Sequence, residues 1–398
     1  MGFIESGGVV MRFLVLGAGK MGRAVVFDLC KFNPDAKIIV VDCNAVRLEK
    51  VTKEFPSENL SVIRADVQDT EELSYVLSGV DVAISCVPFK FNYDLAKAAL
   101  ESGSSFCDLG GNEDIVRKQF LLDEMAREKE LAIIPDCGLA PGLVSILAAS
   151  AYNDLDETHD IHIRVGGLPV EPRPPLNYAQ YFSVEGLLSE YIEDATIIKD
   201  SKLLRVPSLT DVEEVSFHAP FGPLEAFHTS GGISTLPSTL GSNLRNLDFK
   251  TIRYEGHCEK IKFLRDLGLM NSSPLASASH HVSPRQLLCE LLEQRLPVAE
   301  PDVVLIRVEA RGMKKDLHTE ITWEAIDYMD ESTRLSAMMR TSAFPISIIA
   351  QMLANDEIKD RGTLYQELSV PRTRFLEEMR KRGIMLTRTE KTLVTTGS

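Results

Sequence analysis

Short apolar runs alternate with amphipathic segments along the first third of the chain. The apolar runs occupy residues 13–16, 36–42, 61–66, 81–87, 105–109 and 131–135. Segments with helical periodicity lie between them, for example residues 92–101 and 113–129. Strands that alternate with helices at this spacing predict a parallel sheet with helices on both faces. We therefore predict an α/β fold with a Rossmann-type, doubly wound sheet.

The hydrophobic pattern changes after residue 142. Residues 161–165, 302–308 and 319–324 alternate apolar and polar side chains, as strands do when only one face is covered. This pattern predicts a second, α+β domain with a mixed sheet. An apolar helix over 335–354 is expected to pack on the nucleotide domain, and a last helix over 373–382 ends at a glycine. Residues after Glu390 are expected to fray.

The first predicted strand leads directly into Gly17-x-Gly19-x-x-Gly22, which opens a helix. The first glycine permits a tight turn, the second lets a pyrophosphate approach the backbone, and the third lets the helix pack on the strand. Lys20 and Met21 begin the helix, whose free N–H groups would face the phosphates. This context predicts a dinucleotide-binding unit, and a βαβ unit that binds nothing is the alternative.

The second predicted strand ends in Asp42, 20 residues after Gly22. A carboxylate here would bind the adenosine ribose hydroxyls and repel a 2′-phosphate, so the predicted cofactor is NAD. Ligands of parallel sheets lie beyond the carboxyl ends of the strands, although Asp and Pro also end strands for turn reasons alone. Five further residues at strand ends are predicted to contact the cofactor: Asp66, Val67, Cys86, Val87 and Pro88.

Composition and charge narrow the function classes. A chain of 398 residues with 44% hydrophobic and 25% charged residues is typical of a globular protein with two or three domains. A net charge of −15, without a basic patch, argues against nucleic-acid or anionic-membrane partners. Seven cysteines without a C-x-x-C motif indicate reduced thiols. With no apparent signal peptide or membrane span, a cytoplasmic protein is expected.

A polar cluster in the second domain contains candidate catalytic residues. Residues 225–232, Glu-Ala-Phe-His-Thr-Ser-Gly-Gly, include His228, whose imidazole can transfer a proton near neutral pH. Arg253 lies near a predicted strand end, and its guanidinium would suit a substrate carboxylate. From spacing alone, a structural imidazole and an inter-strand ion pair are the alternatives. The other histidines are not joined to ligands at metal spacing, so no metal is predicted.

Several longer motifs resemble those of one family. They are Val-Leu-Gly-Ala-Gly-Lys-Met-Gly at 15–22, Asp-Leu-Gly-Gly at 108–111, Ile-Pro-Asp-Cys-Gly-Leu-Ala-Pro-Gly at 134–142, and Phe-Gly-Pro-Leu-Glu-Ala-Phe-His-Thr-Ser-Gly-Gly at 221–232. From residue 11 to about 386 the chain resembles the superfamily of saccharopine dehydrogenase (glutamate-forming) and L-lysine 6-dehydrogenase. The resemblance implies an NAD-binding domain over 11–141, completed by C-terminal helices within 335–390. It also implies a catalytic and dimerisation domain over 142–334.

Two departures from the saccharopine pattern favour the lysine dehydrogenase branch. Ala140 stands where saccharopine-type enzymes tend to have Asp, and His257 stands where Phe is commoner. The resemblance then implies oxidation of the ε-amino group of L-lysine to 2-aminoadipate 6-semialdehyde, which cyclises to piperideine-6-carboxylate, with release of ammonia. His228 or Asp108 would take the proton, and Arg253 would hold the α-carboxylate. A homodimer or larger homo-oligomer is expected.

Two other functions remain open from the sequence. One is a reductase of the saccharopine or carboxyspermidine type, which would need a second carboxylate-binding group and often NADP. The other is a non-catalytic NAD-binding sensor, against which the intact polar cluster at 225–232 argues.

Overall fold

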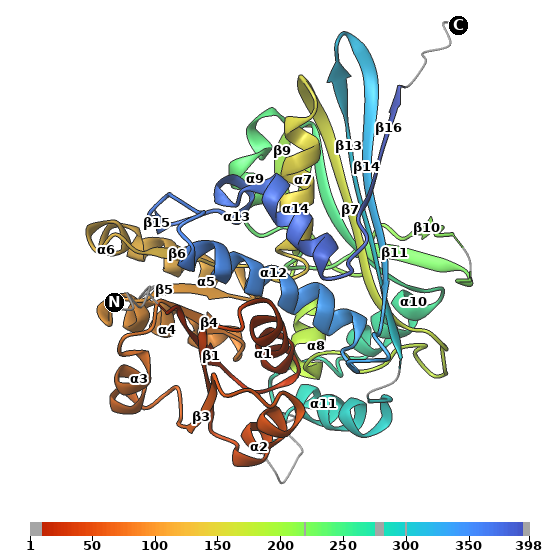
Figure 1. The fold of residues 1–398 in the computed structure, drawn as a ribbon. Coiled ribbons are helices and arrows are strands. Elements are labelled where there is room, and N and C mark those ends of the chain that lie inside the picture. The colour runs from red at the N-terminus through yellow and green to blue at the C-terminus, as the bar shows by residue number, and fades with distance from the viewer. Residues whose placement is uncertain (1–9, 219, 275–281, 299–300, 393–398) are drawn as a thin grey trace, which may run out of the picture. The chain divides into compact units, whose positions relative to one another are not determined.

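The computed structural model describes residues 10–218, 220–274, 282–298 and 301–392 (Figure 1). The chain forms two compact units, and each combines segments that are distant in sequence. Unit 1 comprises Met1–Gly138 and Ser342–Pro371, and unit 2 comprises Leu139–Thr341 and Arg372–Ser398. The chain therefore leaves unit 1 after the sixth strand of its sheet and later returns to it.

Unit 1 is built on a seven-stranded sheet with the order β15-β6-β5-β4-β1-β2-β3. Its strands are β1 (Arg12–Leu16), β2 (Lys37–Asp42), β3 (Leu60–Arg64), β4 (Val82–Ser85), β5 (Ser105–Asp108), β6 (Ala132–Ile134) and β15 (Gly362–Thr363). All the pairings are parallel. The strand order reverses direction at β1, which is the doubly wound arrangement that the alternating pattern predicted.

Helices alternate with these strands. They are α1 (Lys20–Phe32), α2 (Ala45–Glu54), α3 (Thr70–Leu77), α4 (Asn92–Glu101), α5 (Glu113–Gln119), α6 (Asp123–Glu128) and α13 (Gln366–Ser369), together with the part of α12 (Ala337–Ala354) from residue 342. The segment predicted as one helix over 113–129 is divided by a 3₁₀ turn at Phe120–Leu122. Leucine, alanine and valine side chains from the strands and from α3, α4 and α6 form one continuous core.

Unit 2 is built on a mixed sheet with the order β10-β11-β12-β7-β13-β14-β16, to which the β8–β9 hairpin is attached at β12. Its strands are β7 (Glu157–Pro169), β8 (Ala195–Lys199), β9 (Lys202–Val206), β10 (Glu213–Val215), β11 (Leu224–His228), β12 (Asn246–Tyr254), β13 (Asp302–Lys314), β14 (Leu317–Tyr328) and β16 (Thr387–Thr392). β12 and β7 are parallel, whereas the other neighbours are antiparallel. The predicted fold class, a Rossmann-type sheet with a second, mixed-sheet domain, is confirmed.

The helices of unit 2 are α7 (Leu143–Asn153), α8 (Val184–Ile192), α9 (Leu236–Thr239), α10 (His257–Asp266), α11 (Pro284–Arg295) and α14 (Arg372–Lys381). The C-terminal segment differs from the sequence prediction. α14 groups with unit 2 (Figure 1). Residues 391 and 392, where fraying was expected, pair with β14 as the end of β16, and the rest of the predicted tail lies outside the described residues. Most side chains of β16 are exposed, so its hydrophobic pattern carried no signal for a strand.

Candidate functional sites

The glycine loop of unit 1 has the shape that a dinucleotide requires. Gly17 has φ +102°, and a Cβ at this position would lie 2.9 Å from the carbonyl oxygen of Cys86. A Cβ at Gly22 would lie 1.7 Å from the carbonyl oxygen of Gly17. Gly19, by contrast, has no protein atom within 4 Å of the position of a Cβ. The fold itself thus requires Gly17 and Gly22, whereas the open space at Gly19 fits a pyrophosphate beside the start of α1.

Asp42 ties the end of β2 to this loop. Its buried carboxylate accepts hydrogen bonds from the backbone N–H of Ala18 (2.8 Å) and of Asn44 (2.8 Å). One bond to each oxygen leaves each a further lone pair, so ribose hydroxyls can still be bound. The exposed guanidinium of Arg47 lies 3.6 Å from the same carboxylate.

The remaining predicted cofactor residues lie at the carboxyl ends of the strands of unit 1. Lys20 and Met21 begin α1 and are partly buried, as are Val67 and Val87, which pack against the core of the unit. Asp66 is exposed and accepts a hydrogen bond from the backbone N–H of Gln68 (3.0 Å). Cys86 donates its N–H to Leu16 (2.8 Å), and Pro88 is exposed. The strand order places these residues along one edge of the sheet. Asp66 and Val67 follow β3, Cys86 to Pro88 follow β4, and β1 lies between these two strands.

Asp108 ends β5 and is completely buried. Its carboxylate accepts hydrogen bonds from the Gln119 side chain (2.6 Å) and from the backbone N–H of Gly110 (2.7 Å) and Asp136 (3.4 Å). Burial raises the pKa of Asp108 above its ordinary value, although the hydrogen bond from Gln119 and the one from Gly110 oppose this. Because β5 is the neighbour of β4, Asp108 lies about one strand spacing, ~4.8 Å, from the strand that leads into Cys86.

In unit 2, the register between β11 and β12 decides which candidate residues share a face of the sheet. His228 is opposite Lys250, and Glu225 is opposite Arg253. Residues directly opposite each other point to the same face, and successive residues along a strand point to opposite faces. His228 and Arg253 therefore lie on opposite faces of the same sheet, so the structure does not bring these two predicted residues together.

His228 belongs to a charge network on its own face. Its Nε2 lies 3.4 Å from Asp211, and its Nδ1 lies 3.3 Å from the carbonyl oxygen of Phe249. Lys250 bridges Asp211 (2.9 Å) and Glu213 (2.7 Å) in the same network. Burial lowers the pKa of His228 below its ordinary value. Both ring nitrogens of His228 therefore face acceptors within unit 2.

Arg253 lies on the other face and is held rigidly. Its Nε donates to the hydroxyl of Tyr191 (3.1 Å), its Nη1 donates to the carbonyl oxygen of Ile252 (2.9 Å), and its guanidinium carbon lies 4.8 Å from the ring centroid of Tyr178. The hydroxyl of Tyr191 lies 3.0 Å from Nε2 of His257. The guanidinium is therefore oriented by two hydrogen bonds and by a stacked aromatic ring.

A chain of hydrogen bonds of defined direction supports Arg253. Nδ1 of His257 lies 2.9 Å from the carbonyl oxygen of Leu176, which can only accept, so Nδ1 carries the proton. Burial lowers the pKa of His257 to about 3, so the ring is neutral and its Nε2 accepts from the hydroxyl of Tyr191. The Tyr191 oxygen is then left to accept from Nε of Arg253.

Arg253 differs from the other buried arginines of the described ranges in having no carboxylate partner there. Four arginines are buried in the described part of the chain. Arg164 pairs with Asp248 (2.8 Å), Arg340 with Asp327 (2.9 Å), and Arg382 with Glu378 (2.5 Å). Among the described residues, no carboxylate oxygen lies within the 4.0 Å ion-pair distance of Arg253, which is only 3% exposed. An unpaired buried charge is costly, so Arg253 is the group of unit 2 best suited to an anionic ligand.

Most of the residues around Arg253 could not be recognised from the sequence. Tyr178, Glu190 and Tyr191 have no motif, and the apolar periodicity of α8 gives its tyrosine the pattern of a core residue. His257 was noted only as a departure from the saccharopine pattern. Glu225, the antiparallel partner of Arg253, belongs to the predicted polar cluster, but its carboxylate accepts from the backbone N–H groups of Gly256 (3.0 Å) and Cys258 (2.6 Å) and forms no ion pair with the guanidinium.

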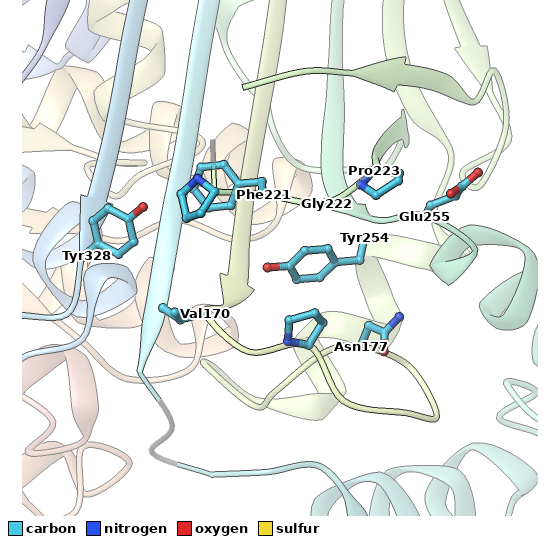
Figure 2. Close-up of a pocket in the computed structure, with 10 residues that line it drawn as sticks. Val170, Asn177, Phe221, Gly222, Pro223, Tyr254, Glu255 and Tyr328 are labelled. Carbon is cyan, nitrogen blue, oxygen red and sulfur yellow. The ribbon is translucent and has the colours of Figure 1, made fainter. Parts of the chain in front are cut away.

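Unit 2 contains a hollow of about 390 Å³, and none of the predicted site residues lines it. Figure 2 shows the rings of Phe221, Tyr254 and Tyr328 around it, with Glu255 at its margin. Tyr254 follows Arg253 in β12 and so points to the opposite face. The hollow is therefore on the other face of the sheet from the guanidinium.

The described ranges contain neither a metal cluster nor a membrane-spanning helix. No group of three or more His, Cys, Asp or Glu side chains there is arranged to hold a metal ion. No helix of the described ranges combines the length and the apolar character needed to cross a bilayer.

Comparison with known families matches both units. The saccharopine dehydrogenase C-terminal domain family matches residues 138–384, and the saccharopine dehydrogenase NADP binding domain family matches residues 13–134. Similar curated proteins include the saccharopine dehydrogenases (NADP(+), L-glutamate-forming) of Saccharomyces cerevisiae, 25% identical over 65% of this chain, and of Schizosaccharomyces pombe, 23% identical over 68%. The matches cover 58% and 60% of those relatives, so the chain spans less than two thirds of their length.

Solved structures show the same fold. Saccharopine dehydrogenase (L-Glu forming) from Saccharomyces cerevisiae superposes with a TM-score of 0.79 at 20% identity, covering 96% of this chain and 100% of that one. A homospermidine synthase from Legionella pneumophila, solved in complex with NAD, superposes with a TM-score of 0.64 at 14% identity, covering 98% of this chain and 93% of that one. At these identities the likeness extends to the fold alone.

Proposed function

The chain belongs to the saccharopine dehydrogenase family, and we propose that within this oxidoreductase family it is an NAD-dependent L-lysine 6-dehydrogenase. The observation that carries the proposal is the buried guanidinium of Arg253, which has no carboxylate partner among the described residues. An amino-acid substrate brings such a carboxylate. Ala140 and His257, the two departures from the saccharopine pattern, favour lysine over saccharopine as that substrate.

The proposed reaction removes two electrons from the ε-carbon of lysine. The ε-ammonium first loses a proton, because an ammonium nitrogen has no lone pair with which to expel hydride. NAD, when bound, supplies the hydride acceptor. Water then adds to the resulting imine and ammonia leaves, so that 2-aminoadipate 6-semialdehyde and one reduced nicotinamide are formed per lysine and per water consumed. The semialdehyde can cyclise to piperideine-6-carboxylate.

The glycine loop and Asp42 are proposed to hold the cofactor. Gly19 leaves room for the pyrophosphate beside α1, and Asp42 keeps a lone pair on each oxygen for the ribose hydroxyls. The negative charge of Asp42 supports NAD over NADP, because it would repel a 2′-phosphate. Asp66 and the backbone from Cys86 to Pro88 are proposed to contact the adenine and the nicotinamide ribose from opposite sides of β1.

Arg253 is proposed to bind the α-carboxylate of lysine. Nε and Nη1 are used internally, so Nη2 and the second proton of Nη1 are available for a carboxylate. The ring of Tyr178 and the hydroxyl of Tyr191 fix the plane of the guanidinium before the substrate arrives. Such preorganisation reduces the entropy lost on binding.

Of the two candidates for the proton acceptor, we propose Asp108. His228 is separated from Arg253 by the sheet, and its ring nitrogens already face Asp211 and the carbonyl oxygen of Phe249. Asp108 ends the strand next to the one that leads into Cys86, where the nicotinamide is expected. Its raised pKa also brings the carboxyl nearer to the pH at which it would work.

A saccharopine-type, NADP-dependent reductase is the second candidate function. One observation favours it: the exposed guanidinium of Arg47, 3.6 Å from Asp42, could pair with a 2′-phosphate. The curated relatives also carry NADP in their names.

The two candidates are distinguished by a nicotinamide-absorbance screen. Amino acids, polyamines and saccharopine are each supplied as substrates with NAD and with NADP. We expect turnover of L-lysine with NAD, rising toward alkaline pH because an amine of pKa about 10.4 must lose its proton. Turnover of saccharopine with NADP, in the absence of lysine turnover, would establish the second candidate in its place.

A further inference from the structure

Glu190 is a second charged side chain near Arg253 to which the proposed reaction gives no role. It lies in α8 beside Tyr191 and is partly buried. Its backbone carbonyl accepts a hydrogen bond from the N–H of Ser230 (3.1 Å), which fixes this turn of α8 against the end of β11. In the described part of the chain, its carboxylate accepts no hydrogen bond and has no cation within the 4.0 Å ion-pair distance.

Glu190 and Arg253 are electrostatic neighbours that do not form an ion pair. Burial raises the pKa of Glu190 to about 7, and the charge of Arg253 opposes this rise. The charges of both residues also act on the hydroxyls of Tyr178 and Tyr191. Arg340 and Asp327, by contrast, pair directly at 2.9 Å in the same unit. Here no ion pair within 4.0 Å is formed, so neither charge is neutralised by direct contact with the other.

We propose that Glu190 binds the α-ammonium group of the same amino acid whose α-carboxylate binds Arg253. A zwitterionic α-amino acid carries these opposite charges on neighbouring atoms, so one ligand can satisfy both side chains at once. The ammonium group is a donor only and the carboxylate of Glu190 an acceptor only, which makes the contact a charge-assisted hydrogen bond. The inference rests on the proposed function in that it places the substrate carboxylate at Arg253.

The pairing makes Glu190 a specificity residue for the α-amino acid class. It would disfavour ω-amino acids without an α-amino group, because the buried carboxylate of Glu190 would then be left without a partner. Arg253 would disfavour diamines in the same way, because they bring no carboxylate. The pair would thus select amino acids with both α-substituents, whatever group is oxidised at the far end of the side chain.

Substrate analogues that lack one charged group test the assignment. L-Lysine is compared with 6-aminohexanoate, which is lysine without the α-amino group, in wild type and Glu190→Gln. We expect the variant to lose about 10- to 100-fold in kcat/KM for L-lysine and to keep or exceed the wild-type value for 6-aminohexanoate, because no charged carboxylate is then left without a partner. Asp194→Asn is the control, because it removes an equal charge from an exposed position four residues away and should change neither value.

Two results would overturn the proposal. One is an equal loss for both substrates in Glu190→Gln, which would indicate a structural role, and the other is no loss for either. Glu190→Asp provides a second variant, which keeps the charge on a shorter side chain and should lose part of the preference for L-lysine if the distance to the ammonium matters.

Binding separates this inference from the reaction itself. Calorimetric titration compares L-norleucine, which has the α-amino acid head without an ε-amine, with hexanoate. Wild type should bind L-norleucine more tightly, and Glu190→Gln should remove the difference. If lysine is not oxidised with either cofactor, the proposed function fails while this titration still decides the role of Glu190. Equal binding of the two ligands by wild type would contradict the inference.

Discussion

Glu190→Gln gives a stability prediction that needs no substrate. Burial raises the pKa of Glu190 from 4.5 to about 7 in the folded protein. The folded state therefore holds this proton more tightly than the unfolded chain does. The resulting stabilisation is complete below the unfolded pKa of about 4.5 and is lost as the pH rises through about 7. At about pH 8 the wild type holds an ionised, partly buried carboxylate without a partner among the described residues.

The size of the effect follows from the pKa difference. A rise from 4.5 to about 7 is about 2.5 pKa units, and at 1.36 kcal/mol per unit it amounts to about 3 kcal/mol as an upper bound. Glutamine is neutral and nearly isosteric, so Glu190→Gln removes this cost at about pH 8 and changes little at about pH 4.5. For a unit of this size, about 3 kcal/mol corresponds to a rise in Tm of roughly 6–12 °C.

Differential scanning calorimetry of the ligand-free protein between about pH 4.5 and pH 8 measures this difference. The exposed Asp194→Asn serves as the charge-matched control. A Tm of Glu190→Gln below that of wild type at about pH 8 would refute the reasoning. So would a difference that does not change with pH, because the account attributes the gain to ionisation alone.

Three further predictions concern the cofactor, the substrate and the fold. Asp42→Asn should reduce the ratio of kcat/KM with NAD to kcat/KM with NADP by about 10-fold or more, whereas Arg47→Ala should raise this ratio. A wild type that already prefers NADP would show the role given to Asp42 to be wrong. Arg253→Ala should raise the KM for L-lysine about 100-fold with a smaller effect on kcat, because the guanidinium binds the carboxylate in ground and transition states alike. An effect on kcat alone in steady-state kinetics would contradict this role. Asp302→Ala should lower the Tm by roughly 4–8 °C, equivalent to about 2 kcal/mol. The reason is that the Asp302 carboxylate caps α12 by accepting from the N–H groups of Ala337 (2.6 Å) and Met338 (2.9 Å). An unchanged Tm would argue against the cap.

The architecture of unit 1 could be predicted because local and global signals agree there. Each buried parallel strand is a short apolar run, and each ends at a residue suited to a turn, such as Asp42 or Asp108. The glycine loop carried its own signal, since Gly17 and Gly22 are required by the local backbone. The part of the site that depends on backbone geometry was therefore accessible from the sequence.

The mixed sheet of unit 2 was harder to predict. The sequence indicated strands at 161–165 and 302–308, but β7 and β13 each extend over 13 residues. Charged residues such as Arg164 and Arg307 interrupt the apolar pattern, and they are accommodated by ion pairs with Glu213 and Glu324 from other strands. No local rule reveals partners so distant in sequence.

The candidate substrate site could be found only in part for the same reason. His228 was recognised in a polar cluster and Arg253 near a predicted strand end, but their placement on opposite faces depends on the register of β11 and β12. A register is a tertiary property, and a shift of one residue would reverse the assignment. Glu190 lies in an amphipathic helix where a glutamate ordinarily faces solvent, and only the fold places it near Arg253.

Isotope transfer shows whether lysine is oxidised at its ε-carbon. L-Lysine deuterated at the ε-carbon is incubated with the enzyme and NAD, and the reduced nicotinamide is analysed by mass spectrometry. We expect one deuterium in each reduced nicotinamide, together with stoichiometric release of ammonia. Deuterium that is transferred only from α-deuterated lysine, or a complete lack of lysine turnover, would contradict this expectation.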